Sequence, residues 1–101
     1  MSTDDINELN GLIQISELID TNINSAFNTY ARFFGKPARF KSSNKMTALN
    51  LFTERLKKYI DANDLEVLSN YAAIYAMEPG FGEEYDKVSK HIYHCIEKQY
   101  N

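Results

Sequence analysis

The sequence has a single cysteine, Cys95, so no disulfide can form within the chain. It also lacks a long apolar stretch, because the longest unbroken run, from Tyr71 to Met77, is far shorter than the roughly 18 to 20 residues of a membrane-spanning helix. The first residues are acidic, whereas a secretory leader begins with basic and then apolar residues. We therefore expect a soluble protein of the reducing cytoplasm that makes no membrane contact.

Motifs of catalysis are missing as well. The sequence contains no glycine-rich phosphate loop, no nucleophile elbow and no Cys-x-x-Cys pair. Adjacent acids occur at residues 4–5 and 83–84, where helices are expected to start and where carboxylates complement the helix dipole. Paired carboxylates that perform acid–base catalysis need one buried member, and an exposed first turn provides none. We therefore predict a protein that is not an enzyme and has no cofactor.

One pair of side chains has a spacing that occurs in metal sites. His91 and Cys95 are four residues apart, so they share one face of a helix. A zinc site normally needs at least three protein ligands, and the remaining candidates, such as Glu84, are not marked by any motif. No third group is evident that would orient a Cys–His nucleophile. Because Cys95 falls on the apolar stripe of the expected helix, we interpret it as a small core residue and predict no metal site.

Apolar residues recur in steps of three and four, and no segment alternates as a strand does. A first helical segment is expected over residues 3–34. It should end at Gly35, because glycine permits a left-handed closing turn and Pro37 cannot extend a helix. The segment is either one long helix or two, since residues 20–22 can start a second one and Gly11 weakens the first part.

Three further helices are expected. One begins at residue 43 or 44, and the next opens with a capping box formed by Asn63 and Glu66 and ends at Pro79-Gly80. The last opens near Gly82 and should bury the residues on one stripe, which are Tyr85, Val88, Ile92, Cys95 and Ile96. We predict an all-α fold, a compact single-domain bundle of four or five helices over residues 1–101, with a long N-terminal helical segment and a basic loop at residues 35–43.

Charge is distributed very unevenly along the chain. Residues 32–58 contain eight of the eleven basic residues and a single acid, Glu54, which gives this stretch a net charge of +7. Residues 1–31 and 59–101 carry −5 each, and the whole chain carries −3. We call residues 32–45 the basic segment; aromatic residues are interleaved with its basic residues, which are Arg32, Lys36, Arg39, Lys41 and Lys45. Such a protein presents surfaces of opposite charge, and a partner can recognise them.

Like charges crowded into a loop repel one another unless something relieves them. The loop can fold back on the acidic helices of the same chain, bind an acidic protein surface, or contact phosphates while Phe33 or Phe40 stacks on a base. The pI of about 5.3 argues against broad affinity for nucleic acid. The seven tyrosines are too many for a small bundle to bury completely, so some should lie at the surface, where tyrosines favour protein contacts.

From these patterns we expect a small non-enzymatic regulatory or inhibitory protein that docks on a partner protein. The basic side chains would pair with anionic groups and an aromatic one would supply apolar contact, the expected site being Arg32, Lys36, Arg39, Phe40, Lys41 and Lys45. Binding of nucleic acid or a phosphorylated ligand by the same loop is one alternative, and a structural homo-oligomer formed through exposed tyrosines is another. In size, acidity and lack of catalytic groups the chain is similar in kind to small bacterial and phage regulators.

Overall fold

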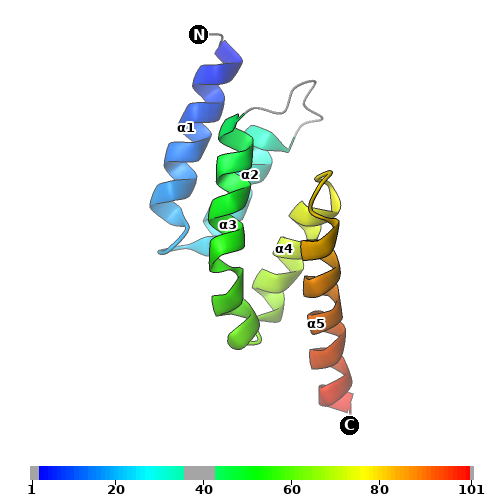
Figure 1. Cartoon of the computed structure of the whole chain (residues 1–101). Coiled ribbons are helices and arrows are strands. Elements are labelled where there is room, and N and C mark those ends of the chain that lie inside the picture. The colour runs from blue at the N-terminus through cyan, green and yellow to red at the C-terminus, as the bar shows by residue number, and fades with distance from the viewer. Residues whose placement is uncertain (1–2, 36–42, 101) are drawn as a thin grey trace. The chain divides into compact units, whose positions relative to one another are not determined.

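The computed structural model describes residues 3–35 and 43–100, which form five α-helices and no strand (Figure 1). The helices are α1 (Thr3–Leu18), α2 (Ile23–Phe34), α3 (Ser43–Asp61), α4 (Leu65–Ala76) and α5 (Gly82–Tyr100). The all-α prediction is confirmed, with five helices in the described residues. The chain divides into two compact units, which are Met1–Glu54 and Arg55–Asn101. The boundary between them falls inside α3. The single-domain assignment stays a prediction. None of the described helices combines the length and the apolar character needed to cross a bilayer.

The first helical segment is two helices, and the break lies where residues 20–22 allow one. Asn22 is the N-cap of α2, and its side-chain oxygen accepts a hydrogen bond from the backbone N–H of Ser25 at 3.2 Å. α2 ends at Phe34, before Gly35 as predicted, but the expected left-handed closing turn is wrong. Gly35 has φ −77°, in the right-handed region, because its N–H donates to the carbonyl oxygen of Ala31 and so continues the helical bonding.

The core of the first unit is built on aromatic side chains. α1 and α2 pack against each other across the short joint at residues 19–22 (Figure 1). Phe27 of α2 stacks on Phe52 of α3, with ring centroids 4.8 Å apart and planes 6° apart. Tyr30 meets the same ring edge-on at 5.9 Å. Both arrangements suit the aromatic quadrupole, so the rings of Phe27 and Tyr30 on α2 pack against Phe52 in the middle of α3, and Phe52 is fully buried.

The joint between α3 and α4 has a different cap from the predicted one. Asp64, not Asn63, is the N-cap of α4, and its side chain accepts from the backbone N–H of Val67 at 3.2 Å. Asn63 instead closes α3 in the left-handed conformation, with φ 53°. Its N–H donates to the carbonyl of Ile60, and the N–H of Asp64 donates to that of Tyr59. These two bonds form a Schellman motif, in which asparagine is one of the few residues other than glycine that tolerate the required φ.

The second unit contains a continuous row of aromatic rings. It runs from Tyr59 at the end of α3 through Tyr71 and Tyr75 of α4 to Phe81, with successive centroids 6.1, 5.8 and 5.4 Å apart. α4 and α5 pack side by side and are joined through residues 77–81 (Figure 1). Gly80 has φ 95°, and the N–H of Phe81 donates to the carbonyl of Glu78. The Glu78-Pro79-Gly80-Phe81 sequence therefore makes a type II-like turn, which needs glycine at its third position.

α5 buries less of its predicted stripe than the periodicity indicates. Val88 is fully buried, whereas Tyr85 and Ile96 are exposed and Ile92 and Cys95 are half-buried. The prediction that Tyr85 and Ile96 belong to the core is therefore wrong. Tyr85 and Ile96 lie together at one edge of the sector that the five positions span, and the side around Val88 is the covered one.

Candidate functional site

Two of the six predicted partner-binding residues lie in the described part of the chain. Arg32 is exposed in the last turn of α2, with its guanidinium carbon 5.0 Å from the centroid of the Phe33 ring. Lys45, in the first turn of α3, is only 9% exposed and takes part in an interaction within the chain. The other four residues, Lys36, Arg39, Phe40 and Lys41, lie outside the described residues. Their part in binding stays a prediction.

Arg32 is held in a geometry that suits recognition. A guanidinium within about 6 Å of a ring centroid is attracted by the negative face of the ring. The Phe33 ring therefore restricts the exposed Arg32 side chain, and a restricted side chain loses less entropy when it binds a partner. Lys57 and Lys58 are exposed on α3, as expected for the solvated face of that helix. Lys45 contributes less exposed charge than the sequence predicts because most of its surface is covered.

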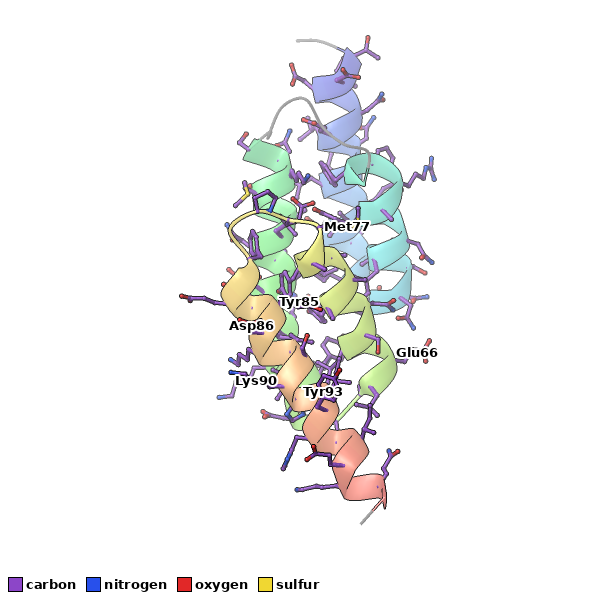
Figure 2. All side chains as sticks on the ribbon, turned by 90° about the vertical axis from the view of Figure 1, so that its right-hand side faces the viewer. Glu66, Met77, Tyr85, Asp86, Lys90 and Tyr93 are labelled. Atoms are coloured by element: carbon purple, nitrogen blue, oxygen red, sulfur yellow. The ribbon has the colours of Figure 1, made fainter. Side chains whose placement is uncertain are left out.

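Several large apolar side chains are exposed on two helices. On α1, Ile6, Leu9 and Ile13 share one face, opposite the buried Ile15. On α5, Tyr93 is 69% exposed, and Figure 2 shows it on the same helix as Tyr85 and Lys90. The expectation that some tyrosines lie at the surface is confirmed. Amphipathic side chains in such positions are suited to contacts with another protein.

A cluster of three polar side chains joins the α3–α4 joint to α5, and we call it the Asn63 cluster. His91 Nε2 lies 3.0 Å from Asn63 Oδ1 and 3.6 Å from Cys95 Sγ. The Cys95 thiol also donates toward the same Asn63 oxygen, at 3.4 Å. The i to i+4 spacing of His91 and Cys95 predicts their proximity, but the sequence does not identify Asn63 as the third member. The prediction that Cys95 is a core residue is wrong, since the thiol is half-buried among polar atoms.

The geometry of the Asn63 cluster argues against a Cys–His nucleophile. In a catalytic triad one ring nitrogen of the histidine faces the nucleophile and the other faces the orienting group. Here Asn63 and Cys95 both face Nε2, so a proton that Nε2 donates to Asn63 blocks it as a base for the thiol. Glu84 is not a third metal ligand either: no group of three or more His, Cys, Asp or Glu side chains in the described residues could hold a metal ion. One Glu84 carboxylate oxygen is buried with no hydrogen-bond partner among those residues.

Tyr71 is the described group with a strongly perturbed pKa. Burial raises the pKa of its hydroxyl far above the usual value, and Tyr75 and Tyr59 add to the rise, while Arg55 opposes it. The Tyr71 hydroxyl is therefore protonated at neutral pH and cannot act as a base. Its place in the row of rings gives it a structural role.

Comparison with known proteins does not assign a family. No protein-family model, no curated protein and no solved structure matches this chain.

Proposed function

We propose that the protein is a non-enzymatic interaction protein that docks on the acidic surface of a partner protein and thereby inhibits or regulates it. The observation that carries this proposal is the charge distribution, a stretch of +7 between two flanks of −5 each. The proposed contact residues are Arg32, Lys36, Arg39, Phe40 and Lys41 of the basic segment. Lys45 is largely covered and takes part in an interaction within the chain, so it would add only to the positive field.

The charges would act mainly on the encounter between the two proteins. A concentrated positive field attracts an acidic surface from a distance and orients it, whereas the acidic flanks disfavour a wrong approach. Close pairing and apolar burial would then slow dissociation, with Phe40 as the expected anchor. Arg32 supports this view because its side chain is exposed and is restrained by the Phe33 ring.

A charge reversal with a matched control tests the proposal. The variant K36E/R39E/K41E removes three positive charges of the basic segment and adds three negative ones. The control K87E/K90E/K98E makes the same change in net charge at three exposed lysines of α5. We expect a partner captured from the native lysate to bind the wild type and the control, and to bind the basic-segment variant about 100-fold more weakly. Thermal melts should agree for the three proteins.

The same experiment separates a nucleic-acid partner from a protein partner. The lysate is treated with nuclease in one arm, and the dissociation constant of the purified complex is then measured at several salt concentrations. A steep linear fall of log K with log[salt] together with loss of capture after nuclease would indicate phosphate binding. A partner that binds both triple variants equally well would refute the role of the basic segment.

A homo-oligomer is the second candidate, and the exposed Tyr85 and Tyr93 favour it. Such residues can continue an apolar contact across a two-fold axis. Sedimentation of the wild type and of Y85S/Y93S at two concentrations tests it. A sedimentation coefficient that stays at the monomer value for the wild type would exclude this candidate.

A further inference from the structure

We propose that Asn63, His91 and Cys95 form a metal-binding site for a borderline-soft divalent ion of the Zn²⁺ class, with water completing the coordination. This inference is independent of the basic segment. The site lies within the second unit and joins the α3–α4 joint to the middle of α5.

The spacing of the three donor atoms matches that of ligands around one ion. Zinc is held at about 2.0–2.1 Å by imidazole nitrogen, about 2.0–2.2 Å by oxygen and about 2.3 Å by thiolate, so tetrahedral ligands lie about 3.3–3.6 Å from one another. In the Asn63 cluster the nitrogen–sulfur distance is 3.6 Å, the sulfur–oxygen distance 3.4 Å and the nitrogen–oxygen distance 3.0 Å. The three atoms thus form a triangle that an ion could cap after movements of a few tenths of an ångström.

The local structure places all three donors in advance. The helix places His91 and Cys95 one turn apart on the same face, an arrangement that needs no further ordering. The backbone of Asn63 is fixed by the Schellman motif that closes α3, with φ 53°, and its amide oxygen lies 3.0 Å from His91 Nε2 of α5. The amide oxygen of Asn63 is a neutral donor. The site would therefore combine one imidazole nitrogen, one thiolate sulfur and one amide oxygen.

Binding would replace the hydrogen bonds of the cluster with metal–ligand bonds. The Cys95 thiol would release its proton to water and bind as thiolate, while His91 would bind through the Nε2 lone pair with its remaining proton on Nδ1. The Asn63 amide would bind through its oxygen and remain neutral. Because Asn63 is exposed and the other two side chains are half-buried, an ion can enter from water and keep at least one water ligand. Such an open position distinguishes the site from a closed structural zinc site.

Cobalt titration of the full-length protein is the direct test, because a Co²⁺–thiolate bond gives a charge-transfer absorption band that nitrogen and oxygen ligands do not give. We expect one Co²⁺ to bind per chain with this band, Zn²⁺ to displace it, and Zn²⁺ to raise the Tm. The band should be lost in C95S, and metal binding should be lost or greatly weakened in H91Q.

Two further variants make the test specific. N63G removes the Asn63 side chain but keeps a residue that is favoured at a left-handed closing position, so it should weaken Co²⁺ binding while the circular dichroism spectrum stays unchanged. H94Q removes the neighbouring exposed histidine and should bind Co²⁺ as the wild type does. Absence of the band at saturating Co²⁺, equal binding by N63G and the wild type, or loss of binding in H94Q would each overturn the proposed three-donor site.

Discussion

One close contact between two helices involves Gly11 of α1. This glycine is buried, and a Cβ atom built on it would lie 2.7 Å from both Cβ and Cγ of Phe33 on α2. Both Phe33 atoms are near the backbone, so no change of rotamer can remove the first contact. Replacement of Gly11 by alanine must therefore push the two helices apart or distort one of them.

The expected effect is the difference of two opposing terms. Alanine stabilises the interior of a helix by about 1 kcal/mol relative to glycine. Forcing an additional methyl group into a well-packed contact costs about 1–3 kcal/mol, and the rigid position of the Phe33 Cβ places this case near the upper end. We therefore expect G11A to lower the free energy of unfolding by about 2 kcal/mol, which corresponds to a fall of about 10 °C in Tm for a chain of this size.

Urea unfolding followed by far-ultraviolet circular dichroism measures this difference, with G82A as the matched control. A Cβ at Gly82, the first residue of α5, would meet no atom within 4 Å, so G82A should be as stable as the wild type or slightly more stable. Adding F33A to G11A should not restore stability, because alanine keeps the Cβ atom that causes the closest contact. If G11A were as stable as G82A, the inferred contact between α1 and α2 would be refuted.

Two further outcomes are expected in the second unit. The variant D64A removes the N-cap of α4 and should lower the free energy of unfolding by about 1 kcal/mol. D64N keeps an acceptor oxygen, so its free energy of unfolding should stay close to that of the wild type in the same urea assay. Burial raises the pKa of Tyr71 above the value of about 10 that tyrosine has in an unfolded chain, so the unfolded state loses its proton first as the pH rises. The free energy of unfolding should therefore fall above about pH 10, by up to about 1.4 kcal/mol per pH unit for this residue, and the fall should be smaller in Y71F. An equal fall in both proteins would contradict the assignment.

Local signals predicted most of the helix ends. Residues 20–22 break the first segment because Asn22 can accept a hydrogen bond from the first turn of α2, and a proline–glycine pair ends α4. Such caps depend on a few neighbouring residues, which the sequence displays directly. Burial along α5 was less predictable. Periodicity shows which residues share a face, but the width of the covered sector depends on how neighbouring helices pack.

The six contact residues predicted from the sequence show a further limit of sequence reasoning. Charge can be counted from the sequence, yet its exposure depends on tertiary packing. Arg32 and Lys45 both belong to the basic segment, but Arg32 is exposed and Lys45 is largely covered. The long aliphatic stem of lysine allows such covering while the ammonium group reaches a partner.

The sequence predicts Asn63 as the N-cap of α4, whereas Asp64 takes that position, and this difference explains why the sequence does not reveal the Asn63 cluster. Asn63 and Asp64 are both good N-caps, so the sequence alone does not decide which of them caps α4. When Asp64 takes that role, Asn63 becomes the left-handed residue that closes α3. Its amide is then not needed as a cap and can meet side chains 28 and 32 residues later in the sequence. A difference of one residue in a local cap thus decides whether His91 and Cys95 remain a pair or gain a third donor, and it is this third donor that makes a metal site worth testing.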